Sequence, residues 1–322
     1  MEVDLKNNSH IALVDFDTPI VSSAASIQRN YITVTHTASG RKKEYDNITA
    51  FRAWLKDNEK WTEDQFTWEC TPKLVEPVGH AIQIMKNKVE SILAQPWCKD
   101  VKLFVGGKGN FRRDIYPEYK ANRAAKPLAF KDVYDYAVKK WSDKIVVCDG
   151  YEAEDHAAAE AYAAYLKCKE SGDKAAGGKV LCFVDKDLLM VPTISFNYNK
   201  PEEGVKWQDE LSGYKCFAKQ MLIGDRSTDN IRGVEAVTPE MKDLFGIKTK
   251  SVGEASAKKI LEGLETEKDV LERLVQVYKM AYKEEWKKMM DFTGKLVWIT
   301  RHYKQPFDIG YELERVGVVV ND

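Results

Sequence analysis

The chain has 322 residues, of which 44% are hydrophobic, 11% aromatic and 31% charged, with a formal net charge of −1. This composition is typical of a globular protein and excludes a disordered, collagen-like or low-complexity chain. The longest uncharged apolar runs fall far short of the roughly 18 residues that a membrane span requires, and the acidic start Met1–Asp4 does not resemble a signal peptide.

Short apolar runs alternate with amphipathic stretches along the first two thirds of the chain. Strands are expected at 11–14, 101–105, 144–148 and 180–184, and a β-hairpin at 31–37 and 41–45. Helices are expected at 48–56, 80–93, 156–167, 207–223 and 267–290. This alternation predicts an α/β fold with a mostly parallel central sheet flanked by helices. The rhythm ends near residue 220, which predicts a core of residues 1–220 and a helical region of 221–322.

Acidic side chains follow three of the predicted strands. They are Asp15 and Asp17, then Glu152, Glu154 and Asp155, then Asp185 and Asp187, while Asp225 and Asp229 lie in a later turn-rich segment. The carboxyl ends of parallel strands meet at one edge of a sheet, so the seven that follow strands should converge, and Asp225 and Asp229 would join them if their segment folds back. Such crowding is relieved by divalent cations, and oxygen ligands suit Mg²⁺ or Mn²⁺. Two such ions ~3.5–4 Å apart can support phosphodiester hydrolysis.

Residues 101–140 form a basic segment with ten Lys or Arg against four Asp or Glu, a local net charge of +6. Pro117 is suited to the first turn of a helix, which would place Lys120 and Arg123 on one face. Cations interleaved with the aromatic residues Phe111, Tyr116 and Tyr119 can contact phosphates and stack on an unpaired base. The alternative is a basic surface helix whose aromatic rings lie in the core.

Glycine-containing turns near Gly233 and Gly253 suggest a further contact with phosphates. The second turn leads into a segment with Lys258, where backbone N–H groups at a helix start could bind a phosphate without reading sequence. A plain helix start is the alternative interpretation.

Together these segments resemble the 5′→3′ exonuclease and flap endonuclease family, above all its phage-encoded replication exonucleases. The matching motifs are Val14–Asp17, Asn110–Arg123, Glu152–Asp155, Val184–Asp187 and Gly224–Val234, in the expected order within residues 11–261. The resemblance implies a PIN-like nuclease core, a basic arch at about 106–140 and a C-terminal helix–hairpin–helix-type region.

The resemblance also implies a set of functional residues. Two Mg²⁺ or Mn²⁺ ions would be held by Asp15, Glu152, Glu154, Asp155, Asp185, Asp187, Asp225 and Asp229. Lys120 and Arg112 would stabilise the scissile phosphate. DNA would be contacted by Arg113, Tyr116, Tyr119, Arg123, Gly233, Gly253 and Lys258, with a K⁺ ion at the hairpin.

The implied activity is cleavage of duplex or flapped DNA, or of an RNA–DNA hybrid, by a monomer during phage replication. The six cysteines show no metal-ligand spacing and are typical of free thiols in a reducing compartment, which agrees with the host cytoplasm.

Three departures from the family pattern stand out. The family usually carries an Asp after the second strand, but Leu103–Arg113 holds no acidic residue and has Gly106 and Gly107 instead. Glu154 replaces the usual Asp. The usually compact glycine hairpin is split by an insertion at about 235–250.

Two other interpretations remain open. Asp15–Thr18 and Gly224–Asp229 also resemble a haloacid-dehalogenase-type phosphatase, in which Asp15 would be phosphorylated and Asp17 would act as general acid and base. That interpretation leaves the acidic residues at 152–155 and 185–187 unexplained. A non-catalytic nucleic-acid-binding relative is the other, supported by the missing carboxylate after the second strand.

Overall fold

The computed structural model describes residues 3–5 and 8–320 and separates into two compact units. The first comprises the chain up to Asp17, Glu90–Ala124 and everything from Lys144 onward, and the second comprises Thr18–Val89 and Ala125–Asp143. No division falls at residue 220, where we expected one. The helices after residue 220 belong to the first unit because one hydrophobic core runs from Leu13 in the sheet to Leu313 near the C-terminus.

A six-stranded sheet forms the centre of the first unit. Its order is β6-β5-β1-β7-β8-β9, with β1 His10–Asp15, β5 Cys98–Gly106, β6 Ile145–Cys148, β7 Lys179–Cys182, β8 Thr193–Phe196 and β9 Val205–Gln208. The neighbours from β6 to β8 pair in parallel, and only β9 runs antiparallel, against β8. The mostly parallel central sheet is therefore confirmed. Val14 pairs with Leu103 and Cys182, so the ends of these strands share one edge.

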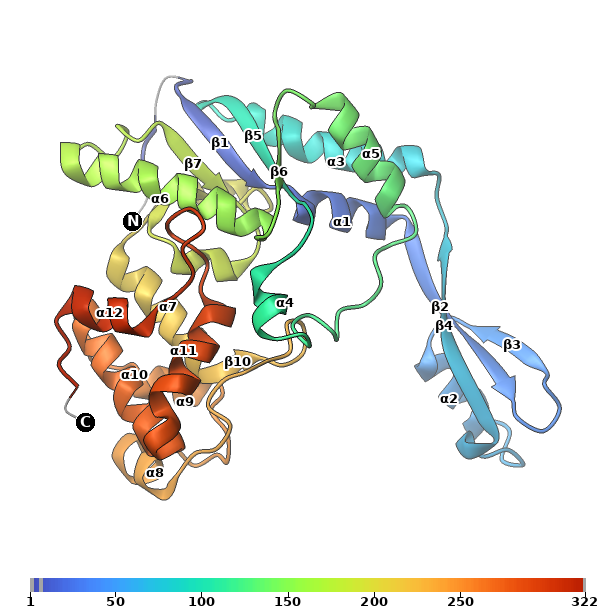
Figure 1. Cartoon of the computed structure of the whole chain (residues 1–322). Helices are drawn as coiled ribbons and strands as arrows, with labels where there is room; N and C mark the ends of the chain where they lie inside the picture. Colours follow the sequence, from blue (N-terminus) through green and yellow to red (C-terminus); the bar gives the residue numbers. More distant parts are fainter. Residues whose placement is uncertain (1–2, 6–7, 321–322) are drawn as a thin grey trace. The chain divides into compact units, whose positions relative to one another are not determined.

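Helices cover this sheet and continue beyond it (Figure 1). They are α4 Phe111–Ile115, α6 Ala153–Ser171, α7 Glu210–Ile223, α8 Pro239–Phe245, α9 Glu254–Ile260, α10 Glu267–Tyr282, α11 Trp286–Val297 and α12 Ile309–Val316. The short strands β10 Gly224–Asp225 and β11 Ile231–Arg232 form an antiparallel pair. Two expected helices differ. Trp207 belongs to β9, and the helix expected to reach residue 290 breaks at Lys283, which has a φ of 52°.

The second unit is built on a three-stranded antiparallel sheet. Its elements are β2 Gln28–His36, β3 Lys42–Tyr45, β4 Phe66–Leu74, α2 Ile48–Lys56, α5 Phe130–Lys140 and most of α1 Asp17–Ser26 and α3 Val78–Leu93. The expected hairpin is confirmed, and Asn47 caps α2 by accepting the Ala50 N–H at 2.9 Å. Strand β4 was not expected, although it pairs along the whole of β2. The buried ring of Phe51 contacts Phe66 and Trp54 and anchors α2 on this sheet.

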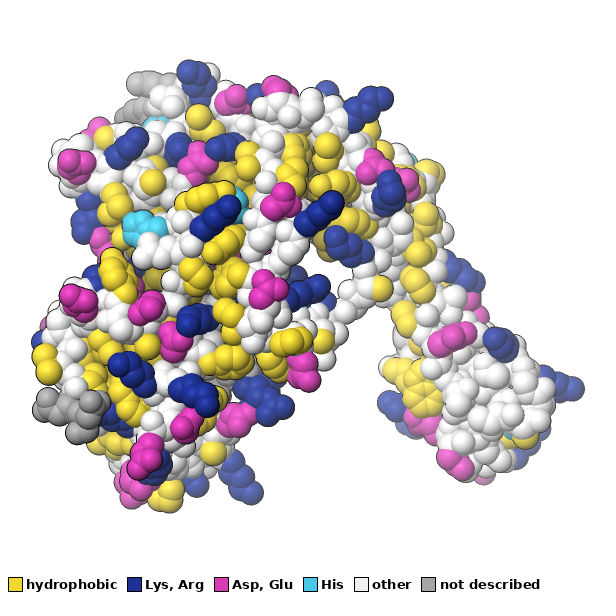
Figure 2. Space-filling model, viewed as in Figure 1, with side chains coloured by type: hydrophobic (Ala, Val, Ile, Leu, Met, Phe, Trp, Pro, Cys, Tyr) yellow, Lys and Arg dark blue, Asp and Glu magenta, His cyan; other side chains and the backbone are white. Residues whose placement is uncertain are grey.

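The surface carries charges of both signs, and the cysteines form no disulfides. Figure 2 shows basic and acidic side chains interspersed over the visible face. All six cysteines are free thiols, as expected. No helix in the described part of the chain is long and apolar enough to cross a membrane.

Candidate functional site

Several of the acidic residues lie in the turns that connect a strand of the sheet to the following helix. Glu152 is the N-cap of α6, and its backbone N–H donates to Asp155 Oδ2 at 3.2 Å. Asp185 caps the short 3₁₀ helix Lys186–Met190 by accepting the Asp187 N–H at 3.0 Å. Helix starts favour such residues because their free N–H groups and the helix dipole stabilise a carboxylate. Local capping therefore fixes these carboxylates at the carboxyl edge of the sheet.

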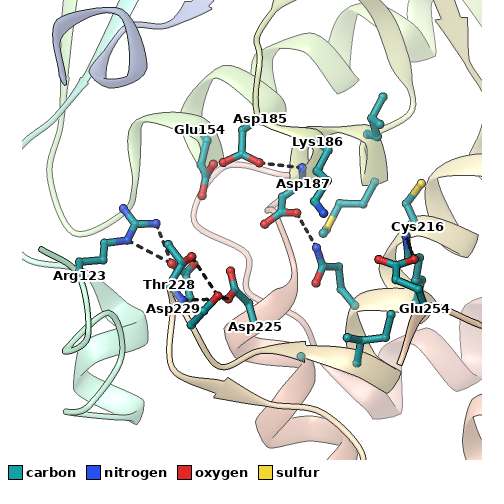
Figure 3. Close-up of a pocket in the computed structure, with 17 residues that line it drawn as sticks. Arg123, Glu154, Asp185, Lys186, Asp187, Cys216, Asp225, Thr228, Asp229 and Glu254 are labelled. Carbon is teal, nitrogen blue, oxygen red and sulfur yellow. Dashed lines mark hydrogen bonds and ion pairs between the residues drawn. The ribbon is translucent and has the colours of Figure 1, made fainter. Parts of the chain in front are cut away.

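Six carboxylates line one cavity of about 460 Å³. We call it the acidic cavity, and its carboxylates are the predicted ligands Glu154, Asp185, Asp187, Asp225 and Asp229 together with Glu254. The five predicted ligands come from the start of α6, the turn after β7, and β10 with the loop that follows it, and Glu254 begins α9. Figure 3 shows Glu154, Asp187 and Asp225 directed toward a shared space. The turn-rich segment thus folds back onto the strand ends.

The other three predicted metal ligands are not among the described residues that line this cavity. Asp15 ends β1 and is only 6% exposed. Glu152 and Asp155 flank Glu154 at the start of α6, and both form ion pairs, with Arg112 or Lys120. Asp17 accepts the backbone N–H of Gly106 at 3.0 Å, which gives it a role in joining β5 to the start of α1.

Crowding within the cavity changes how its carboxyls ionise. Burial, together with the nearby carboxylates Asp185, Asp229 and Asp225, raises the pKa of Asp187 to about 6. Burial and the charge of Glu152 hold the pKa of Glu154 well above its usual range. These groups therefore resist carrying all their negative charges together in the absence of a cation.

The donor set fits a hard divalent cation, since it consists of carboxylates with no His or thiolate. Within residues 3–5 and 8–320, no three His, Cys, Asp or Glu side chains are already close enough together to hold a metal ion. The carboxylates thus share a cavity without having closed into a ligand shell.

Arg112, expected at the scissile phosphate, is completely buried. Its guanidinium forms a two-pronged ion pair with Asp155, with N–O distances of 2.6 and 2.9 Å. The remaining N–H groups donate to the backbone carbonyls of Leu296 at 3.1 Å and Trp298 at 2.6 Å, and one also reaches Glu152 at 3.3 Å. In this arrangement Arg112 connects α4 and the start of α6 to the end of α11. Its side chain is not accessible to a substrate.

Lys120 and Arg123 lie beside the acidic cavity. Buried Lys120 forms ion pairs with Glu152 and, at 3.7 Å, with Asp229. Arg123 contacts Asp229 Oδ1 at 2.7 Å, and its side chain is 48% exposed. Burial by itself would raise the pKa of Glu152, but Lys120 and Arg112 lower it to about 2. Lys120 and Arg112 thus hold Glu152 ionised.

The helix expected to start at Pro117 is absent from the described structure. Helix α4 ends at Ile115, and successive turns follow through residue 122. Lys120 has a left-handed φ of 59°, and its backbone N–H donates to the Asp229 carbonyl at 2.9 Å. That bond replaces the helical partner, so a contact 109 residues away in the chain overrides the local preference.

The residues predicted to bind DNA fall into different surroundings. Arg113 and Lys258 are exposed, and Gly253 precedes Glu254, which lines the acidic cavity. The Tyr119 ring is buried, and its hydroxyl donates to Glu152 at 3.0 Å, so it supports the site from within.

Two further residues of that set take part in internal packing. The half-buried Tyr116 packs edge-on against Phe292. Gly233 is buried, and a Cβ added there would lie 2.4 Å from the Leu222 carbonyl oxygen. The absence of a side chain therefore lets the end of β11 pack closely against the end of α7.

Asp149 is a carboxylate that the sequence interpretation missed. It follows β6 directly, which is the same strand-end signal that identified the others. Its Oδ1 accepts the Lys108 N–H at 2.6 Å. The same oxygen lies only 2.2 Å from the position that a Cβ on Gly107 would take, so a side chain there would collide with it. An acidic side chain from β6 thus occupies the space beside the glycines that follow β5.

Comparison with known proteins supports the expected resemblance. The chain is 27% identical over 189 residues to a curated 5′-3′ exonuclease of Buchnera aphidicola subsp. Schizaphis graminum. The match covers 53% of this chain and 61% of that relative, so the chain spans about three fifths of its length. No family model matches the chain.

Solved structures from bacteriophage T5 also align with most of the chain. The T5 D15 protein co-crystallised with metal ions aligns over 89% of this chain and 97% of its own, at 13% identity and a TM-score of 0.35. The D15 flap endonuclease in a pseudo-enzyme–product complex with DNA and metal ions covers 89% and 99%, at 14% identity and a TM-score of 0.34. These TM-scores are too low to establish a common fold.

Proposed function

Because the chain is related in sequence to a 5′-3′ exonuclease, we propose that it is a divalent-metal-dependent 5′ nuclease acting on DNA. The observation that carries the proposal is the acidic cavity, in which carboxylates from three separate segments face one another beside Arg123. A phosphatase that uses Asp15 as nucleophile would need that residue open to substrate, whereas it is 6% exposed and lies outside the cavity lining.

The five predicted ligands in the acidic cavity would hold the cation, with Mg²⁺ or Mn²⁺ as the expected ion. When bound, such an ion lowers the pKa of a water molecule and stabilises the leaving oxygen of a phosphodiester. The half-exposed Arg123 is placed to attract a substrate phosphate at the rim. Lys120 adds a buried positive charge beside Asp229 and Glu152, and a fixed charge of this kind can stabilise the negative charge that develops on a phosphate in the transition state.

The finer proposal concerns substrate and setting. We propose duplex or 5′-flapped DNA, or an RNA–DNA hybrid, as substrate, with a role in phage replication in the host cytoplasm. Arg113, Arg123 and Lys258 are exposed cations that would contact the backbone. Such contacts predict binding that ignores sequence and weakens steeply with salt.

The proposal is tested by incubating the protein with 5′-labelled duplex and 5′-flap oligonucleotides in Mg²⁺ or in excess EDTA. Release of labelled mononucleotides indicates an exonuclease, and release of a labelled flap indicates an endonuclease. The Asp185→Asn variant, purified identically, controls for contaminating nucleases. Absence of metal-dependent cleavage, or equal cleavage by Asp185→Asn, overturns the proposal.

A further inference from the structure

Tyr198 lies at the same sheet edge as the acidic residues, although nothing in its sequence surroundings marks it. It follows β8 by two residues, and β8 pairs in parallel with β7 through Cys182 and Phe196. On its other side β7 pairs with β1, where Val14 is opposite Cys182. The chain past β8 therefore runs beside the turn that holds Asp185, with Asp15 at the end of the next strand.

The Tyr198 hydroxyl is buried without a hydrogen-bond partner among the described residues, and the whole residue is only 7% exposed. Other buried tyrosines of the first unit are satisfied. Tyr278 donates to the Met221 carbonyl at 2.9 Å, and Tyr214 donates to Glu312 at 3.0 Å. Burying a hydroxyl without a partner costs free energy, so an orphaned one at a candidate site calls for a functional reason.

Two carboxylates at this edge of the sheet act electrostatically on the hydroxyl. Burial raises the pKa of Tyr198, and the carboxylates of Asp15 and Asp185 raise it further, together with the Cys182 thiol. Of the two carboxylates, Asp15 has the larger influence. Asp15 is also one of the three predicted metal ligands that do not line the acidic cavity, and the other two, Glu152 and Asp155, are paired with Arg112 or Lys120.

We propose that Tyr198 is a positioning residue for the metal site, whose hydroxyl donates to Asp15 and holds that carboxylate toward the acidic cavity when a cation binds. The inference rests on the proposed metal-dependent function. A hydrogen bond of this kind orients a ligating carboxylate, and loss of such a partner typically weakens metal binding about 10–100-fold.

The test measures Mn²⁺ binding directly, by calorimetry on the full chain without substrate, together with the melting temperature in EDTA. For Tyr198→Phe we expect Mn²⁺ affinity to fall about tenfold or more. Its melting temperature in EDTA should stay unchanged or rise, because an unsatisfied hydroxyl is removed. The matched control Tyr278→Phe should lower the melting temperature and leave Mn²⁺ affinity unchanged, because its hydroxyl is satisfied.

A mutant cycle with Asp15→Asn identifies the acceptor. Tyr198→Phe should have no further effect on Mn²⁺ affinity in the Asp15→Asn background, but should keep its effect in the Asp185→Asn background. The reverse pattern overturns the assignment to Asp15. Wild-type Mn²⁺ affinity in Tyr198→Phe overturns the positioning role alone, whereas a wild-type protein that binds no Mn²⁺ overturns the proposed metal-dependent function and this inference with it.

Discussion

Asp149 Oδ1 occupies the space that a side chain on Gly107 would need, 2.2 Å from the position of the missing Cβ. The same oxygen accepts the Lys108 N–H at 2.6 Å. The family resemblance implies a carboxylate after the strand expected at 101–105, and in this chain the carboxylate beside Gly107 comes from Asp149, directly after β6. The glycine and the aspartate are therefore complementary, and neither can be changed without affecting the other.

Gly107→Asp should destabilise the protein, because its Cβ would collide with the Asp149 carboxylate and place two like charges together. We expect a loss of about 1–3 kcal/mol in the free energy of unfolding, measured by urea denaturation. The double variant Gly107→Asp with Asp149→Gly should recover most of that loss and should retain or lower the Mg²⁺ concentration for half-maximal cleavage. A double variant that is no more stable than Gly107→Asp would show that the two residues are independent.

Asp185→Asn should abolish cleavage while leaving duplex affinity within a few-fold of wild type. Asp185 lines the acidic cavity, and removing one of several crowded charges should leave the fold unharmed. Single-turnover cleavage and binding in EDTA measure the two effects separately. Asp243→Asn, on the exposed face of α8, is the control and should cleave normally. Normal turnover by Asp185→Asn would remove this residue from the metal site.

The acidic cavity should make the metal-free protein less stable as pH rises. The pKa of Asp187 is about 6 in the folded protein against 3.8 for an ordinary Asp, so the folded state binds more protons between these values. The free energy of unfolding should therefore fall between about pH 4 and 6, by up to about 3 kcal/mol from this one group. Urea midpoints in EDTA at pH 4.5 and 7 measure it. Asp187→Asn should flatten the dependence, and an equally steep profile in that variant would contradict the assignment.

Arg112→Met should destabilise the protein by about 3–5 kcal/mol, because it leaves Asp155 buried without a counter-charge. It also leaves the carbonyls of Leu296 and Trp298 without their donor. Urea denaturation gives the stability, and cleavage per folded molecule gives the activity. Arg123→Ala is the comparison, since a half-exposed pair contributes at most about 1 kcal/mol. A stable but inactive Arg112→Met would instead favour the catalytic role expected from sequence.

Lys120→Ala should reduce single-turnover cleavage of 5′-labelled duplex by ~10²–10³, the effect typical of a lost preorganised charge in an active site. Duplex affinity should fall much less, because one phosphate contact among several contributes little. Lys131→Ala, an exposed change on α5, serves as control. Hydrolysis of a small phosphomonoester is measured beside it, and a phosphatase would leave that rate unaffected by Lys120→Ala. Cleavage of DNA at the wild-type rate would refute the proposed role of Lys120.

The strand-end carboxylates could be identified from sequence because their placement depends on short-range rules. An apolar run followed by an acidic cap predicts a strand leading into a helix, and parallel strands bring those caps to one edge. Asp185 and Asp187 after β7, and Glu154 at the start of α6, follow this logic. Asp149 obeys the same rule, so it could have been found in the same way.

Tertiary structure alone decided which charged groups face the cavity and which face one another. In the sequence, Arg112 and Lys120 belong to one basic segment, and nothing there indicates which of them would contact a phosphate. In the fold Arg112 is enclosed by Asp155 and two carbonyls near residue 297, while Lys120 is turned by a backbone bond to Asp229. Local propensity predicted a helix from Pro117, and that distant hydrogen bond prevented it. The pairing of a cation depends on which carboxylates the completed core brings within a few ångströms, and no local pattern contains that information.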